Sequence, residues 1–257
     1  MTDKLTETNE DELGYFLRLA NSCCNEALSE LKGPLKFLGA IDSLYMEFIQ
    51  DAGGIKPATA SILLVNAHAS LRAAMGLAFS GQLLPVFMAL RGSIESALYA
   101  NAMVQNPELQ EVWLNRDRSE NGRQICRNEF TAGKMFISLT QAQDREFSDR
   151  LREAYDATID FGAHPNNRLL LSSTHIETLG TGEQALKFAY LHGGGSFELR
   201  QSLVACAEIG LTVFFAALIC FQKHPRVEAL NLRALELQDQ LPSFVEQLGL
   251  GGDETPK

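Results

Sequence analysis

The stretch LVACAEIGLTVFFAALICF, residues 203–221, decides the fold class of this chain. Its apolar residues occupy almost every face of a helix, so a helix here must be buried by other parts of the protein. With 19 residues the run is also nearly long enough to cross a bilayer. The carboxylate of Glu208 lies inside it, however, and a carboxylate is costly in a membrane. We therefore expect the central helix of a soluble helical bundle, with a membrane span as the less favoured alternative.

The rest of the chain follows a helical pattern. Apolar residues recur every three or four positions, and Pro, Gly and Asn residues mark where helices begin or end. No Pro- or Gly-rich linker divides the sequence, which predicts one domain over residues 9–249, with disordered ends at 1–8 and 250–257. The pattern predicts helices over 11–31, 34–51, 58–80, 84–105, 108–116, 119–141, 143–161, 197–222 and 226–246.

One segment, at about 168–192, does not fit a helix. It begins with a run rich in Ser, Thr and β-branched residues, and a second run ends at His192. Gly180 and Gly182 lie between the two runs and suit a tight turn. We therefore predict one small β-hairpin on a mainly α fold.

Composition limits the classes of partner. Acidic residues outnumber basic ones 32 to 22, which gives a net charge of −10. This balance argues against a general nucleic-acid-binding protein, because clustered Lys and Arg supply phosphate affinity. The polar, acidic beginning of the sequence is unlike a secretory signal peptide, so we expect a cytoplasmic protein. The sequence has no motif of a nucleotide, zinc or calcium site, and we expect no cofactor and no metal.

Two predicted helices, 58–80 and 84–105, carry the charged residues of most interest. The link between them is so short that the helices must be antiparallel neighbours. Positions equidistant from the turn then lie at the same height, which places Arg72 level with Arg91 and His68 level with Glu95. Each pair is four residues apart on its own helix, so each pair shares one helix face.

These charged residues have apolar neighbours and must find partners. Glu95 can pair with His68 or with either arginine, while Glu208 can pair with the remaining arginine. One interpretation is a buried ion-pair network that fixes the register of the bundle. A second is a pocket in which Arg72 and Arg91 flank an anionic group such as a phosphate or a carboxylate. A third is that these residues lie at the surface.

A second polar feature ends the helix over 143–161. The segment YDATIDFGAHPN begins at Tyr155 and presents His164 and Asn166 beside Pro165. A proline at this place favours a helix end followed by a loop. His164 either caps that helix end and is exposed, or it lies at a cleft and approaches the Arg91–Glu95 pair.

The segment RGSIE, residues 91–95, together with Tyr155 and His164-Pro165, resembles a bacterial all-helical family of unknown function that carries an Arg-x-x-x-Glu helix and a Tyr…His-Pro segment. The resemblance implies a helical bundle with a shared polar cluster. Arg168 and His175 are separated by six residues, as in the Arg-x(4–6)-His motif of the HEPN ribonucleases. Here, however, Leu169 stands where that motif has a polar residue, and the segment is predicted to be a strand.

We therefore expect a binding protein whose polar pocket takes a small anionic ligand or a partner. A metal-independent ribonuclease or phosphotransfer enzyme of a toxin or defence system is one alternative, and a structural bundle that forms a homodimer is another. Whether the protein is an enzyme stays open. The residues expected to line the pocket are Arg91, Glu95, His164, Arg72, His68, Tyr155 and Asn166.

Overall fold

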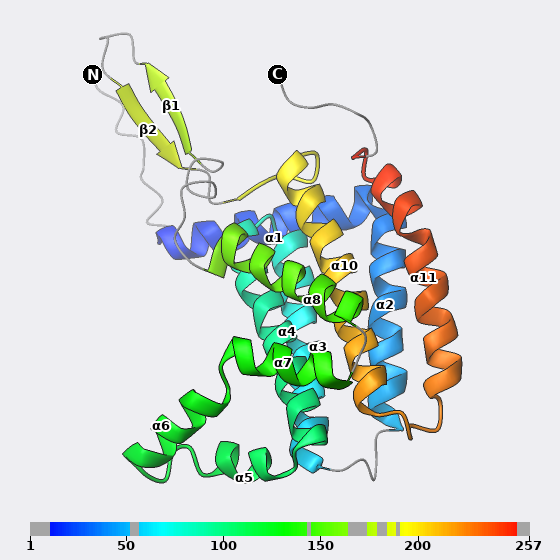
Figure 1. Ribbon diagram of the computed structural model, residues 1–257. Coiled ribbons are helices and arrows are strands. Elements are labelled where there is room, and N and C mark those ends of the chain that lie inside the picture. Colours follow the sequence, from blue (N-terminus) through cyan, green and yellow to red (C-terminus); the bar gives the residue numbers. More distant parts are fainter. Residues whose placement is uncertain are drawn as a thin grey trace, which may run out of the picture.

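The protein is mainly α-helical (Figure 1). The computed structural model describes residues 11–51, 57–142, 145–163, 174–178, 184–188 and 191–250. The predicted disordered ends lie outside these residues, except for Leu250. The helical elements are α1 (Glu12–Glu30), α2 (Lys32–Gln50), α3 (Ala58–Phe79), α4 (Leu83–Gln105), α5 (Glu108–Leu114), α6 (Glu120–Glu129), α7 (Ala132–Ala142), α8 (Arg145–Thr158), η1 (Ile159–Ala163), α10 (Phe197–Cys220) and α11 (Val227–Gln247).

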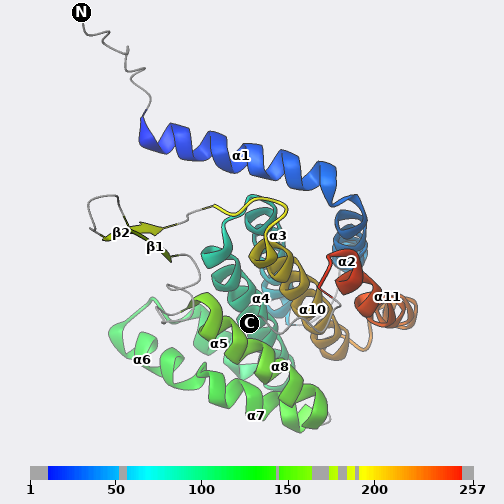
Figure 2. The same ribbon diagram turned by 90° about the horizontal axis from the view of Figure 1, so that it is seen from above.

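The apolar helix α10 lies at the centre of the bundle and contacts α2, α3, α4, α8 and α11 (Figure 2). Its Phe214 is completely buried and packs edge-on against Tyr45 of α2. At Gly210 an added Cβ would lie 3.1 Å from Leu71 of α3 and 3.3 Å from Ile41 of α2. The missing side chain therefore lets α2 and α3 approach α10 closely.

Hydrogen bonds of short polar side chains join α3 to α4. The Asn66 side chain donates to Ser96 at 2.8 Å, and the Ser93 hydroxyl donates to the carbonyl of Ala67 at 2.8 Å. The connecting turn uses Gly81 with φ of 74°, a conformation that favours glycine. As the short link predicts, the two helices are antiparallel neighbours.

The predicted helix over 119–141 is wrong, because the structure divides it into α6 and α7. The break lies at Phe130, whose ring packs on Tyr99 with the ring centroids 4.8 Å apart. The Tyr99 hydroxyl donates to the Phe130 carbonyl at 3.2 Å. A continuous helix would use that carbonyl internally, so tertiary packing on α4 outweighs the helical preference of the local sequence.

Two short strands, β1 (Thr174–Thr178) and β2 (Gln184–Phe188), pair antiparallel within 168–192. Thr174 is opposite Phe188, and Thr178 is opposite Gln184. After β2 the chain returns to the bundle, where the backbone N–H of His192 donates to the carbonyl of Gly81 at 3.0 Å.

Two helices are long and apolar enough to cross a membrane, by length and composition alone. They are α3 and α10, and 50% and 67% of their most hydropathic windows are buried in the protein. A buried core helix of a soluble protein satisfies the same criterion. Neither the soluble nor the membrane interpretation of these helices follows from this composition.

Candidate functional site

The predicted residues His68 and Arg72 lie in one polar cluster with Asp42 of α2, which we call the α2–α3 cluster. Asp42 accepts hydrogen bonds from Arg72 Nε at 2.6 Å and from Arg72 Nη2 at 2.8 Å. Its Oδ1 also lies 2.6 Å from Nε2 of His68. One carboxylate therefore binds two side chains of the next helix, and the arginine is held in the bidentate geometry that suits its planar group.

The surroundings set the charge states in this cluster. Hydrogen bonding from Arg72 lowers the pKa of Asp42 despite partial burial. Burial lowers the pKa of His68, although the charge of Asp42 opposes this shift. A neutral His68 that faces an ionised carboxylate must donate from Nε2. Its ring also stacks on Tyr45, with the centroids 4.9 Å apart, and the Tyr45 hydroxyl donates to the carbonyl of Gly210 in α10 at 2.7 Å.

The other predicted residues form a separate group, the α4–α8 cluster, made of Arg91, Glu95 and Tyr155. Arg91 Nε donates to Glu95 Oε1 at 2.8 Å, and Arg91 Nη2 donates to the Tyr155 hydroxyl at 3.0 Å. That hydroxyl donates to Glu95 Oε1 at 3.2 Å. The guanidinium also lies over the Tyr155 ring, 5.2 Å from its centroid. The three side chains close a triangle that ties α8 to α4.

The α4–α8 cluster lies at the edge of the bundle, not deep inside it as we expect from the apolar neighbours of Arg91. The side chains of Arg91 and Glu95 are 25% and 36% exposed. Tyr155 is buried, and burial, together with the nearby charge of Glu95, raises its pKa. The phenol is therefore a neutral hydrogen-bonding group between the two charges.

The two charged pairs do not share one pocket. They lie at matched heights on antiparallel helices, but the faces of α3 and α4 that meet carry small residues. A Cβ added to Gly92 would lie 3.5 Å from the hydroxyl of Ser70. His68 and Arg72 consequently turn toward α2, while Arg91 and Glu95 turn toward α8. Glu208 contributes to neither cluster.

His164, Asn166 and Arg168 lie outside the described residues, and His175 is described only by its backbone in β1. The predicted approach of His164 to Arg91 stays a prediction. The last described residues before it belong to η1, whose Phe161 packs on Phe87 of α4 with centroids 5.5 Å apart.

A groove with a volume of about 1210 Å³ runs along α10, between α8 and α11. Its floor follows one stripe of α10 and is mostly apolar, with Ala205 and Phe215 on either side of Glu208. Sequence reasoning missed this groove. A partial signal was available, because Gln201, Glu208, Thr212 and Gln222, although seven, four and ten residues apart, fall on one face of an otherwise apolar helix.

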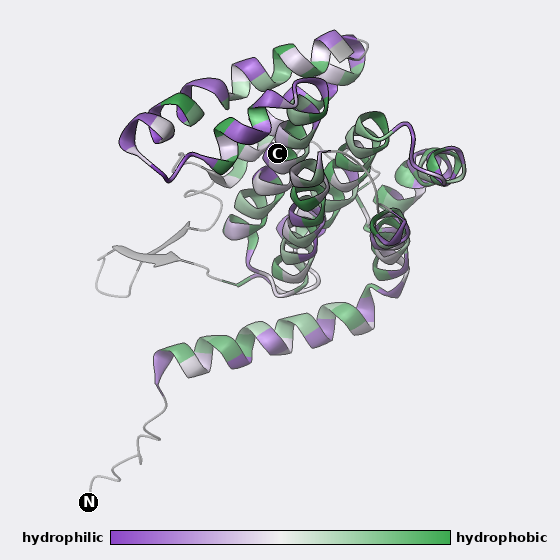
Figure 3. Cartoon of the chain, turned by 90° about the horizontal axis from the view of Figure 1, so that it is seen from below, coloured by the Kyte–Doolittle hydropathy of each residue, from purple (hydrophilic) through white to green (hydrophobic). Residues whose placement is uncertain are grey.

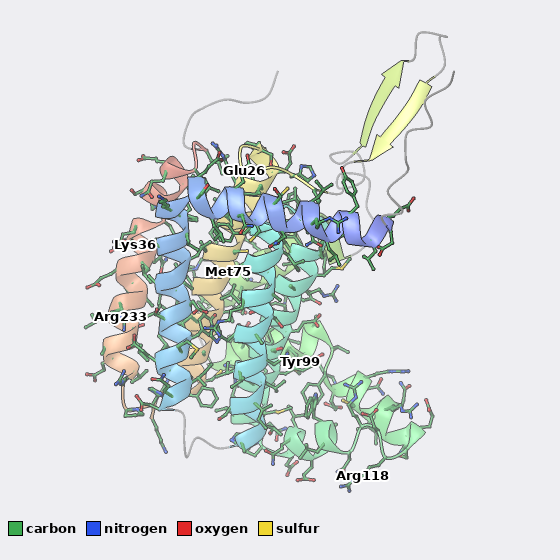
Figure 4. All side chains as sticks on the ribbon, turned by 180° about the vertical axis from the view of Figure 1, so that it is seen from behind. Glu26, Lys36, Met75, Tyr99, Arg118 and Arg233 are labelled. Atoms are coloured by element: carbon green, nitrogen blue, oxygen red, sulfur yellow. The ribbon has the colours of Figure 1, made fainter. Side chains whose placement is uncertain are left out.

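The two walls of the groove are held by different means. The α8 wall presents Ala154 and Ala157 and is tied to α4 by the α4–α8 cluster. The α11 wall is tied to α2, where Arg233 Nη1 binds Glu47 at 2.7 Å (Figure 4). Three of the residues predicted to line a polar pocket, Arg91, Glu95 and Tyr155, therefore position one wall of an apolar groove.

Among the described residues no group of three or more His, Cys, Asp or Glu side chains is placed to hold a metal ion. Comparison with protein-family models, with curated proteins and with solved structures finds no match. The resemblance to a bacterial helical family, and the more distant one to the HEPN ribonucleases, stay predictions.

Proposed function

We propose that the protein is a binding protein whose ligand is an elongated, largely apolar molecule held along α10 between α8 and α11. The observation that carries the proposal is the groove itself. Its volume of about 1210 Å³ lies above the roughly 300–1,000 Å³ of common small-molecule sites, which favours a long ligand. Val204, Leu211 and Ile219 give its floor the apolar contact surface that such a ligand needs.

The polar clusters support an anionic ligand less well than the groove supports an apolar one. The guanidinium of Arg72 is already bound by both oxygens of Asp42, and Arg91 is bound by Glu95. A phosphate or carboxylate would have to compete with a carboxylate fixed at hydrogen-bond distance. We therefore assign these clusters to holding the helices in place.

The uncharged fluorophore N-phenyl-1-naphthylamine tests the proposal. Its fluorescence should rise saturably with the wild-type protein. Ala205→Trp fills the floor of the groove and should weaken binding at least tenfold. Leu232→Trp places the same side chain on an exposed position of α11 that does not line the groove, and it should bind like the wild type.

Circular dichroism checks that each variant is folded. Thr212→Trp, a second groove position, replaces Ala205→Trp if that variant does not fold. Failure of the wild type to bind the probe would refute the proposal. Equal binding by wild type and a folded groove-filled variant would refute it as well.

A second candidate function is assembly into a homodimer through α1. This helix runs crosswise to α2, α3, α10 and α11 near one end of the bundle (Figure 1). Hydrophobic residues occur along its length (Figure 3). Near its N-terminus Leu13, Tyr15 and Leu17 are 66%, 53% and 57% exposed. Exposed apolar side chains that gather in this way are typical of surfaces that bind another protein.

Sedimentation at several protein concentrations tests the dimer. Leu13→Glu combined with Leu17→Glu should convert a dimer into a monomer without loss of helix content. A wild type that is monomeric at high micromolar concentration excludes this candidate. The ribonuclease alternative and the cytoplasmic location stay predictions.

A further inference from the structure

Glu208 lies at the middle of the groove floor, where no positively charged side chain of the described residues pairs with its carboxylate. It is near the midpoint of α10, on the same stripe as Ala205 and Thr212. Neither a hydrogen bond nor an ion pair within the described chain holds its carboxylate. The apolar surroundings raise its pKa, while the open side of the groove leaves it accessible.

The Glu208 side chain is exposed, so its carboxylate keeps contact with water on the open side of the groove, but it loses hydration on the sides that face apolar walls. A positively charged partner would stabilise it there. The charged residues that line the groove are Arg150 and Glu153 on α8, and Glu198 and Glu208 on α10. One positive charge therefore faces three negative ones, and Arg150 is not within ion-pair distance of Glu208. The groove has an excess of negative charge around an apolar surface.

We infer that the ligand of the groove is an amphiphilic cation, with a protonated amine that binds Glu208 and an apolar chain that lies along α10. This inference rests on the proposed function and adds the chemical class of the ligand. An ammonium group supplies both the charge and the hydrogen-bond donors that the carboxylate lacks. The 24 residues of α10 give a floor of about 36 Å, long enough for an extended chain on either side of the charge.

The size of the groove favours a small molecule over a helix of another protein. A helix of 20 residues, about 30 Å long and 10 Å across, has a volume of about 2,400 Å³. The groove offers about half of that. An amphiphile with a single chain fits the available space, whereas a helix would project from it along its whole length.

Displacement of N-phenyl-1-naphthylamine by three chains of equal length tests the inference. Below their critical micelle concentrations, dodecylammonium should displace the probe at a concentration at least tenfold lower than dodecanol, a difference of about 1.4 kcal/mol. Dodecanoate should be weaker than dodecanol. Glu208→Gln should abolish the preference for the amine over the alcohol.

Glu153→Gln is the matched control, because it removes a carboxylate from the wall and keeps Glu208. This variant should retain the preference for dodecylammonium. Equal displacement by the amine and the alcohol would overturn the inference, as would a preference that persists in Glu208→Gln. Strongest displacement by dodecanoate would instead assign the head group to Arg150.

The outcomes also separate this inference from the proposed function. If the probe does not bind to the wild type, the groove is not an apolar binding site and both proposals fail. If the probe binds and all three chains displace it equally, the proposed function stands and only the cationic class is wrong. Displacement by a lysine-containing amphipathic peptide, but not by dodecylammonium, would overturn the small molecule in favour of a protein partner.

Discussion

The α2–α3 and α4–α8 clusters are built from the same sequence spacing but hold the bundle in different ways. His68 and Arg72 are four residues apart, and both bind a carboxylate that belongs to another helix. Arg91 and Glu95 are also four apart, but their charges first neutralise each other on one helix. A neutral phenol from α8 then joins the pair.

This difference decides which residue is indispensable. Asp42 is the shared acceptor of two donors, so its removal leaves both without their carboxylate. Tyr155 adds hydrogen bonds to a charge pair that persists without it. We therefore expect the α2–α3 cluster to contribute more to the free energy of unfolding, and the α4–α8 cluster to adjust where α8 lies beside the groove.

The largest effect should come from the turn that joins α3, which carries part of one cluster, to α4, which carries part of the other. Gly81→Ala introduces a side chain at φ of 74°, where the new Cβ would overlap the backbone of His192. We expect a loss of about 3 kcal/mol in urea denaturation, near the upper range of single substitutions. Gly76→Ala is the control, because an added Cβ meets nothing within 4 Å in α3 and should stabilise the helix slightly. Equal stability of the two variants would contradict this account of the turn.

The next largest effect tests the shared carboxylate directly. Asp42→Ala should lower the free energy of unfolding by about 2 kcal/mol, since the buried His68 ring then lacks its acceptor. The Asp42 side chain is 26% exposed, which reduces the loss below that of a fully buried pair. Asp149→Ala removes an exposed carboxylate that lies 3.6 Å from Arg145, and it should change stability by less than about 0.5 kcal/mol. A loss that is equally small for Asp42→Ala would show that this cluster is only a surface pair.

Acid should weaken the α2–α3 cluster in the pH range where histidine titrates. The folded state lowers the pKa of His68, so the unfolded chain binds a proton first as the pH falls below about 6.5. Stability should therefore decrease between pH 7 and pH 5. The lowered pKa of Asp42 extends the loss to pH values below about 4. His68→Gln should flatten the dependence between pH 7 and pH 5, as measured by urea midpoints, and an unchanged slope would exclude His68 as its source.

The sequence predicts this arrangement up to a definite point. The short link after Phe79 predicts antiparallel helices and places His68 level with Glu95. It does not predict which faces meet, because that choice depends on the close contact of small residues such as Ser70 and Gly92. Asp42 carries no signal of its own, since an isolated acidic residue in an amphipathic helix has no distinctive pattern.

The groove escapes prediction for a related reason. Apolarity on all sides of α10 predicts burial on all sides, but the described α8 and α11 leave one stripe partly open. The spacing of apolar residues shows which face of a helix is apolar. It does not show how many other helices are present to cover that face. The placement of Gln201, Glu208, Thr212 and Gln222 on one face of this apolar helix is the local indication of the opening.

A smaller effect tests the phenol of the α4–α8 cluster. Tyr155→Phe keeps the buried ring and removes the hydroxyl that bonds Arg91 and Glu95, so it should cost about 1 kcal/mol. Tyr15→Phe, at a 53% exposed position of α1, serves as the control and should leave the urea midpoint unchanged. A loss as large as that of Asp42→Ala would mean that the two clusters contribute equally.

The smallest effect separates the clusters by their response to salt. Glu95→Gln keeps an oxygen that accepts from Arg91 and removes the charge. The side chain is 36% exposed and the pair lies on one helix, so the loss should be about 0.5 kcal/mol in dilute buffer. In 1 M NaCl, where screening acts over about 3 Å, that loss should vanish. Asp42→Asn should lose nearly as much free energy of unfolding in 1 M NaCl as in dilute buffer. One amide oxygen then has to accept hydrogen bonds from both Arg72 and the buried His68. Equal salt sensitivity of Glu95→Gln and Asp42→Asn would remove the distinction between a charge pair within one helix and a carboxylate shared across two.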